Sequence, residues 1–283
     1  MATQQYDVFQ PEIWSAKITR FFGDKLLAGS FFLNYSDDVS MGGDTINIPN
    51  IADSFTATDV NVTSGDITAT NLADTTTALS IDKWKAAAFV ISDFQAAQIA
   101  KKYKLQSEYV SAASYKLAKA LDTALLANAG SLTASVGSSS TALVSSNLEA
   151  AIAVMESNSI PLQDCVWFFH PKAYWKEISA IQKYYDASNF GKATTPYGNV
   201  DTLYGMPVLV TANVQAVAGS GHTNLLAYKG AVAYAMANLW GSGKKVRIQV
   251  KSAESLRKKI IADIAYGTVL LNATRGVRVI SNA

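Results

Sequence analysis

Residues 94–128 read FQAAQIAKKYKLQSEYVSAASYKLAKALDTALLAN, and this stretch decides much of the fold. Positions four apart share one face of an α-helix, so apolar residues at that spacing predict one amphipathic helix. Ser92 or Asp93 could cap its start and Gly130 its end. At 1.5 Å per residue the helix would be ~52 Å long, which is unusual in a globular protein. The apolar positions are Leu105, Tyr109, Ala113, Leu117, Leu121 and Leu125.

The chain carries few charged groups for its size. Its 283 residues include 24 Lys and Arg, 22 Asp and Glu, two His and one Cys. Charged residues make up 16% of the chain, whereas about 25% is typical of soluble domains. The net charge is +2, and a near-zero charge favours association. The single Cys165 excludes an intramolecular disulfide framework, and two His exclude a His-rich metal site, so no cofactor or metal is expected.

Acidic and basic residues are segregated along the chain. Residues 26–82 contain eight Asp and no Lys or Arg, whereas residues 244–283 contain nine basic and two acidic side chains, a net +7. The basic tail could neutralise DNA phosphates, but no recognition helix, zinc finger or stacking motif accompanies it. A contact with the acidic segment of another copy accounts for both blocks and is favoured over direct DNA contact. The basic candidates are Arg247, Lys251, Arg257, Lys258, Lys259, Arg275 and Arg278.

The sequence before the long helix predicts an extended excursion. An amphipathic segment begins at Pro11, and residues 45–49 alternate as in a short strand. Residues 50–82 are rich in Thr, Ala and Asp, with a turn signal at residues 64–66. They are predicted to form a two-stranded arm that would reach ~50 Å at about 3.3 Å per residue. Because an isolated hairpin is marginal in water, this arm needs a surface to lie on.

The sequence after the long helix predicts a second, mixed part. Residues 130–146 are rich in Ser and are predicted to form a loop that separates the two parts. A helix is expected over residues 147–157, a buried strand over 166–169 and a helix from Pro171. The sum predicts an α+β fold. Further strands are expected over residues 208–210, 224–227, 231–236 and 246–250, and within 257–280.

Cys165 and His170 are the one pair of residues that suggests nucleophilic catalysis. A nucleophilic Cys needs a nearby base to form the thiolate. The two residues flank a predicted buried strand, and at a separation of five their side chains point to opposite faces. A hydrolase using this pair is therefore a weak alternative, and no catalytic residue is expected. His222 follows a Gly-Ser-Gly sequence and is expected in a loop, without a partner close by in the sequence.

No segment of the sequence predicts a membrane contact. The longest near-continuous apolar stretch, residues 260–271, falls short of the ~20 residues that cross a bilayer. The first residues lack a basic region followed by an apolar one, as a signal peptide would have. Synthesis and folding in a cytoplasm are expected.

Several short motifs occur in an order and spacing that resemble a known family. Together they resemble the major capsid (coat) proteins of tailed bacteriophages, which have the Hong Kong 97-like fold. The resemblance covers nearly the whole chain, although each motif alone is weak. The motifs are Pro11-Glu12-Ile13-Trp14, Gly43-Asp44-Thr45-Ile46-Asn47-Ile48-Pro49, Leu79-Ser80-Ile81-Asp82-Lys83-Trp84-Lys85-Ala86-Ala87-Ala88-Phe89, Leu121-Asp122, His170-Pro171-Lys172-Ala173-Tyr174-Trp175 and Tyr204-Gly205-Met206-Pro207-Val208.

The resemblance implies a division of the chain and a structural, non-enzymatic function. Subunits would assemble as pentamers and hexamers into an icosahedral head shell that encloses double-stranded DNA. An encapsulin-like shell of a cellular nanocompartment is the alternative. The implied parts are an N-terminal arm with the first strand (1–49), an extended loop (50–82), a peripheral domain with the long spine helix (83–130), an axial domain (131–243) and a return to the peripheral domain (244–283).

The resemblance also implies partners and a location. The partners would be other copies of the chain, packaged DNA held by non-specific contacts, and a portal. Because no long extension precedes the arm, a separate scaffolding protein is expected if there is one, and a decoration protein is a further candidate. The protein would be assembled in the cytoplasm of a host bacterium and would reside in the virion capsid, without a membrane partner.

The candidate contacts between subunits are large apolar side chains and residues of the two charge blocks. The apolar ones would anchor neighbouring copies, and the acidic ones would pair with lysines and arginines of a neighbour. The candidates are Trp14, Phe21, Phe31, Asp53, Asp59, Asp66, Asp74, Trp84, Lys101, Lys102, Lys104, Arg257, Lys258 and Lys259.

Overall fold

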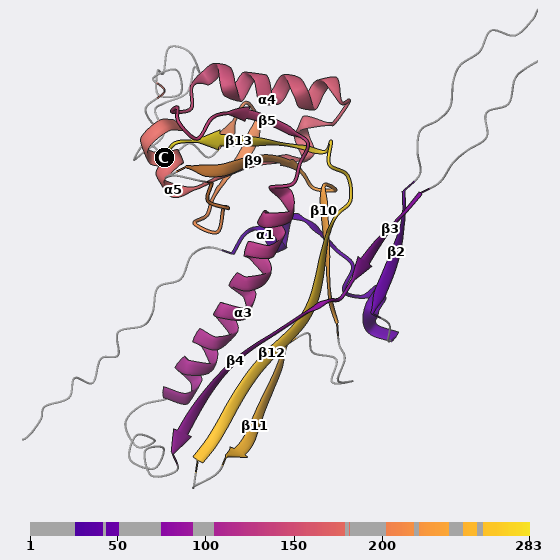
Figure 1. Ribbon diagram of the computed structural model, residues 1–283, viewed down its shortest axis with the longest axis vertical. Helices are drawn as coiled ribbons and strands as arrows, with labels where there is room; N and C mark the ends of the chain where they lie inside the picture. Colours follow the sequence, from indigo (N-terminus) through magenta and orange to yellow (C-terminus); the bar gives the residue numbers. More distant parts are fainter. Residues whose placement is uncertain are drawn as a thin grey trace, which may run out of the picture.

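Two β-sheets and one long helix form the body of the protein (Figure 1). Within the part of the chain that the structure describes, one sheet has five strands, the other has six, and a separate hairpin has two. This arrangement confirms the predicted α+β class. The computed structural model describes residues 26–41, 44–50, 75–92, 105–178, 181, 202–217, 221–237, 246–253 and 257–283.

The five-stranded sheet is built around the 14-residue strand β12 (Arg257–Leu270). Strand β4 (Lys83–Ser92) runs antiparallel along one side of β12. On the other side, β11 (Arg247–Ala253) and β10 (Val232–Ala237) pair with β12 in succession, both antiparallel. The short β1 (Leu33–Asn34) adds to β10 in parallel.

Helix α3 (Leu105–Ala129) lies against one face of this sheet. Ala113, Leu117, Leu121 and Leu125 are all buried, as the four-residue spacing predicted. Tyr109 of the same stripe is half-exposed, and its ring contacts Phe89 of β4 at 5.6 Å. The 25 residues of α3 span ~37 Å at 1.5 Å per residue. The predicted start of the helix, residues 94–104, lies outside the described residues.

The six-stranded sheet lies at the C-terminal end of α3, and α4 (Ser145–Ser157) covers its far face (Figure 1). Strand β6 (Cys165–Phe169) lies inside it and is buried on both faces, as predicted. Phe168 packs toward α3, whereas Trp167 and Phe169 pack toward α4. The strand order is β5 (Ala134–Gly137), β13 (Gly276–Ser281), β9 (His222–Tyr228), β6, β8 (Met206–Val210) and β7 (Thr202–Leu203).

Several elements depart from the expected order along the chain. The Ser-rich stretch is not all loop, because β5 pairs in parallel with β13. β10 belongs to the five-stranded sheet, although it lies within the segment expected in the axial part. Conversely, β13 does not join the sheet of β11 and β12, but pairs with β9 and β5. The helix from Pro171 is one short turn, α5 (Pro171–Ala173), followed by the π-helix Tyr174–Ile178.

The small hairpin of β2 (Thr45–Asn50) and β3 (Thr75–Ser80) packs on the face of the five-stranded sheet opposite α3. The sheet offers small side chains there, which let the hairpin approach closely. A Cβ on Gly267 would lie 2.0 Å from the Ser80 carbonyl oxygen. Three short helical segments complete the described fold: α1 (Ala28–Phe31) and the 3-10 turns Asp38–Met41 and Leu162–Asp164. The small residues beneath the hairpin are Ala233, Ala235, Ala237 and Ala265.

Candidate inter-subunit surface

Cys165 and His170 do not form a nucleophile–base pair. Cys165 opens β6 and His170 follows its last residue, so the length of the strand separates them. The Cys165 thiol is buried and donates a hydrogen bond to the Pro161 carbonyl oxygen at 3.4 Å. Burial, with a smaller effect of the Asp164 charge, raises the pKa of Cys165 to about 11. Because a thiolate is the reactive form, this environment opposes thiol catalysis.

Metal-binding clusters and membrane-spanning helices are absent from the described part of the chain. Within it, no group of three or more His, Cys, Asp or Glu side chains is arranged to hold a metal ion. None of the described helices is both long enough and apolar enough to cross a membrane. The surface features that stand out are instead exposed apolar and basic side chains on the five-stranded sheet.

The predicted contact residues fall into two groups. Five of them lie in the described part of the chain: Phe31, Trp84, Arg257, Lys258 and Lys259. The other nine lie outside the described residues: Trp14, Phe21, Asp53, Asp59, Asp66, Asp74, Lys101, Lys102 and Lys104.

Phe31 takes part in the packing of its own subunit. Its ring makes edge contacts with Phe32 at 5.2 Å and with Phe168 at 5.6 Å. It is half-buried at the junction of α1, α3 and the six-stranded sheet. Only its remaining exposed part is open to a neighbour.

Trp84 is the most exposed of the large apolar side chains described, with 68% of its surface accessible. Its indole Nε1 nevertheless donates a hydrogen bond to Asp263 Oδ2 at 3.0 Å. Asp263 is 1% exposed and also accepts hydrogen bonds from Arg247 Nε at 3.0 Å and Nη2 at 2.5 Å. These bonds hold the exposed indole in one orientation on the sheet.

The electrostatics of this trio are dominated by the Arg247–Asp263 pair. The hydrogen bond from Arg247 lowers the pKa of Asp263, against the opposing effect of burial, and the Trp84 bond lowers it further. The same bond raises the pKa of Arg247. Asp263 is therefore a stable anion at neutral pH, and its charge is balanced within the subunit.

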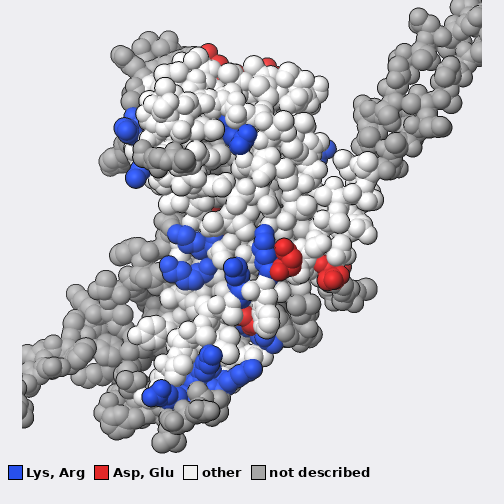
Figure 2. All heavy atoms as spheres, in the orientation of Figure 1, with Lys and Arg blue, Asp and Glu red and all other residues white. Residues whose placement is uncertain are grey.

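Beyond Asp263, the sheet face opposite α3 becomes basic. Lys251 of β11 lies directly opposite Lys259 of β12, and Arg257 is two residues from Lys259, so alternation places all three on that face. Val90 of β4 pairs with Lys259 and is 51% exposed beside them. Figure 2 shows basic side chains gathered at the end of the molecule where β4 and β11 end and β12 begins in Figure 1. We call Lys251, Arg257 and Lys259 the basic face.

Some of these features could not be found from the sequence. Lys251 belongs to the basic face only because of the β11–β12 register, and it was absent from the predicted contact residues. By alternation Lys258 points to the opposite face, toward the α3 side. Ile248 and Val250 on that side of β11 are 51% and 58% exposed, beyond the part of the sheet that α3 covers.

The β2–β3 hairpin sets where the acidic excursion begins and ends. Asn50, the last residue of β2, pairs with Thr75, the first residue of β3. The hairpin lies against the body on Ile48 and Leu79, and its open end is directed away from both sheets (Figure 1). The excursion between these residues lies outside the described part of the chain, so its predicted two-stranded form stays a prediction.

Comparisons with solved structures identify the fold. A chain from Mycobacterium phage Che8 superposes with a TM-score of 0.78 at 18% identity, covering 96% of this chain and 97% of that one. A chain from the capsid of cyanophage P-SCSP1u gives 0.76 at 14% identity, over 99% and 94%. The mature capsid of bacteriophage PhiM1 gives 0.74 at 10% identity, over 96% and 91%. No protein-family model and no curated protein matches the sequence. The protein thus has the α+β capsid fold that the sequence motifs predicted.

Proposed function

We propose that this chain is the shell protein of an icosahedral phage head and assembles as pentamers and hexamers around double-stranded DNA. The observation that carries the proposal is the match along nearly the whole chain to a chain from the capsid of cyanophage P-SCSP1u, at a TM-score of 0.76 over 99% of this chain and 94% of that one. In this proposal the five-stranded sheet with α3 is the peripheral part of the subunit, and the six-stranded sheet with α4 is the axial part. The function is structural rather than enzymatic.

The basic face would be a docking site for the acidic excursion of a neighbouring copy. Like charges directly opposite each other destabilise an antiparallel pair, so Lys251 and Lys259 gain from an anionic neighbour. Residues 51–74 contain four Asp and no Lys or Arg, which makes them complementary. Exposed ion pairs are worth about 0–1 kcal/mol each. Cohesion would therefore come from many such contacts formed together in a closed shell.

Trp84 would be the apolar anchor of the same surface. Tryptophan is prominent among residues that dominate binding energy at interfaces. Because Asp263 already holds the indole in place, burial by a neighbour would cost little side-chain entropy. Trp14 and Phe21 stay candidates for apolar contacts, and Lys101, Lys102 and Lys104 stay candidates for charge pairing.

Charge reversal tests the docking step. We expect Lys251→Glu with Lys259→Glu to raise the subunit concentration needed for assembly roughly tenfold at low salt, since both residues lie on the basic face and many weak contacts act together. Lys229→Glu is the matched control, because Lys229 is exposed on the turn between β9 and β10 and far from the basic face. Sedimentation of the two variants and the wild type measures the assembled fraction. Normal shells from the doubly reversed variant at low salt would contradict the proposed pairing.

The contents of the particles separate a phage head from a nanocompartment. A phage head made in infected cells would protect genomic DNA from nuclease, whereas a nanocompartment would enclose an enzyme. A catalytic role for Cys165 would instead appear as hydrolase activity lost in Cys165→Ala. On the structural proposal, that substitution changes only the packing of β6.

A further inference from the structure

One flank of the five-stranded sheet is covered over only part of its length. β10 and β11 follow one another along the side of β12 that is opposite to β4. On the α3 side of the sheet α1 lies over β10, where the Tyr234 hydroxyl donates a hydrogen bond to the Gly29 carbonyl oxygen at 2.7 Å. Tyr234 is buried there, whereas Ile248 and Val250 of β11, on the same side, are more than half exposed. We call Ile248 and Val250 the uncovered flank.

The uncovered flank begins where the cover by α3 ends. Ile248 pairs with Ala262 and Val250 pairs with Ile260, and both of these β12 residues are buried. Figure 1 shows α3 alongside β4, with β11 on the other side of β12. Exposed apolar side chains therefore lie directly beside the packed face of the sheet. A further apolar element laid over them would remove them from water, which is favourable.

The described chain begins next to this flank. Leu26 is its first residue, and Leu27 packs against the same core cluster as Tyr234. The pairing with β12 places Ile248 six residues and Val250 eight residues beyond Tyr234 along the sheet. At about 3.3 Å per residue these separations are ~20–26 Å. A segment that precedes Leu26 thus needs to extend by about this distance to cover the flank.

The sequence before Leu26 supplies a segment of matching character and length. Residues 14–22 read WSAKITRFF, and their spacing places four large apolar side chains on one face of a helix, with Ala16 and Thr19 on the opposite face. A helix over these residues would be ~12 Å long, and four extended residues up to Leu26 would add ~13 Å. The segment, which lies outside the described residues, is therefore long enough to reach the flank of its own subunit. The apolar residues are Trp14, Ile18, Phe21 and Phe22.

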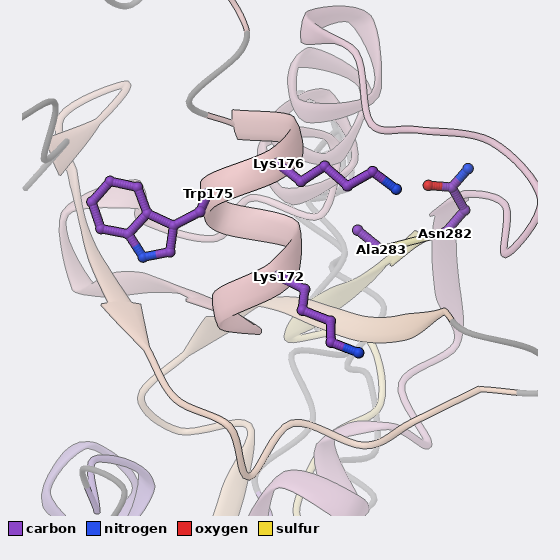
Figure 3. A pocket seen from close by; sticks show the side chains of 5 residues that line it. All are labelled: Lys172, Trp175, Lys176, Asn282 and Ala283. Atoms are coloured by element: carbon purple, nitrogen blue, oxygen red, sulfur yellow. The ribbon is translucent and has the colours of Figure 1, made fainter.

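A hollow beside the six-stranded sheet is a less suitable surface for this segment. Its volume is about 390 Å³, and its lining residues are Lys172, Trp175, Lys176, Asn282 and Ala283. Figure 3 shows the amino groups of both lysines on the side of α5 and the π-helix that faces Ala283, and Trp175 on the other side. Residues 14–22 carry Lys17 and Arg20 and no acidic residue, so the two lysines of the hollow would repel them.

We propose that residues 14–22 of the same chain dock as a helix on the uncovered flank and bury Ile248 and Val250. Two observations support this occupant: the chain enters next to the flank at α1, and the distance along β10 and β11 matches the reach of the segment. The contact lies within one subunit and does not depend on the proposed shell function. Trp14 and Phe21 would then contact their own subunit rather than a neighbour.

Cross-linking of the full chain tests the docking. Cys165 is the single Cys of the chain and is buried, so two introduced cysteines would be the reactive ones. We expect Ile18→Cys with Val250→Cys, treated with a short bis-maleimide as dilute dissociated subunits, to give a cross-linked product of monomer mass. Its yield should exceed that of the control pair about tenfold, because docking raises the effective concentration of the two thiols.

The control pair is Ile18→Cys with Gln249→Cys, because alternation places Gln249 on the opposite face of β11. Equal yields from the two pairs would overturn the proposal. A product of dimer mass from the Val250→Cys pair would also overturn it, because the flank would then be covered by the segment of a second copy.

Hydrogen exchange gives a second, independent readout. We expect Ile18→Ser with Phe21→Ser to speed the exchange of β11 amides about tenfold, because the strand loses its cover and opens more easily. Ala16→Ser with Thr19→Ser is the matched control on the opposite face of the segment and should leave β11 unchanged. Unchanged exchange of β11 in the first variant would contradict the docking. If that variant does not fold, the cross-linking result decides.

Discussion

Asp122 lies where three parts of the chain meet. It belongs to α3 and is 2% exposed. Its Oδ1 accepts the backbone N–H groups of Ala28 at 2.8 Å and Gly29 at 3.3 Å, at the start of α1. Its Oδ2 accepts Asn213 Nδ2 at 2.8 Å. One carboxylate therefore joins the incoming N-terminal segment, the long helix and the loop after β8.

Removal of this carboxylate should destabilise the subunit strongly. We expect Asp122→Ala to lower the free energy of unfolding by about 2–3 kcal/mol, because it leaves buried donors without an acceptor. Asp122→Asn is the matched control and should cost less, since its amide oxygen still serves α1. Once the Asn213 amide turns over, its Oδ1, which has no partner in the described structure, can accept the new amide N–H group. Urea unfolding of the dissociated subunit measures both, and equal stability of Asp122→Ala and wild type would contradict this role.

The Arg247–Asp263 bond predicts a dependence of stability on acid. The hydrogen bond that Arg247 donates lowers the pKa of Asp263 in the folded protein. The charged carboxylate therefore stabilises the folded state at pH values above the ordinary aspartate pKa of about 3.9. That contribution is lost as the pH falls through the lower, folded value. We expect Asp263→Asn to be less stable than wild type at pH 7, with a difference that shrinks below about pH 4. Unfolding titrations at several pH values measure the difference, and a constant difference down to pH 2 would argue against the bond.

At the scale of elements, the close contact of the β2–β3 hairpin with β12 depends on Gly267. A Cβ there would lie 2.0 Å from Ser80 O and 2.8 Å from Ser80 C, both backbone atoms. We expect Gly267→Ala to cost about 2–3 kcal/mol and to displace the hairpin. Gly29→Ala is the control, because nothing lies within 4 Å of a Cβ at that position. Thermal unfolding of both variants measures the cost, and similar behaviour of the two would show that the hairpin does not need this contact.

The positions of individual helices and strands could be predicted from the sequence, whereas the strands that each one pairs with in space mostly could not. The four-residue spacing located the buried stripe of α3, and the unbroken apolar run located β6, because periodicity reports local burial directly. The position of β13 in the six-stranded sheet could not be predicted, since strand partners distant in sequence leave no local pattern. The basic face depends on register in the same way. So does the stacking of the His170 and His222 rings, because His222 opens β9 and does not lie in the loop where the sequence predicted it.

At the scale of the whole molecule, the low charged fraction acquires a physical meaning. The chain is 16% charged with a net +2, yet residues 244–283 alone carry +7 and the remainder −5. The basic face shows that part of the positive block is gathered on one surface of the five-stranded sheet. Trp84 and Val90 add exposed apolar area to that surface. Such a surface is suited to burial against further copies of the chain.

Electron microscopy of the purified protein tests the central claim most directly. The proposed function predicts closed, round shells with pentamers and hexamers, in which the basic face of one subunit lies against a neighbour. Discrete 30.2 kDa subunits or small oligomers under every condition of salt, pH and concentration would contradict it.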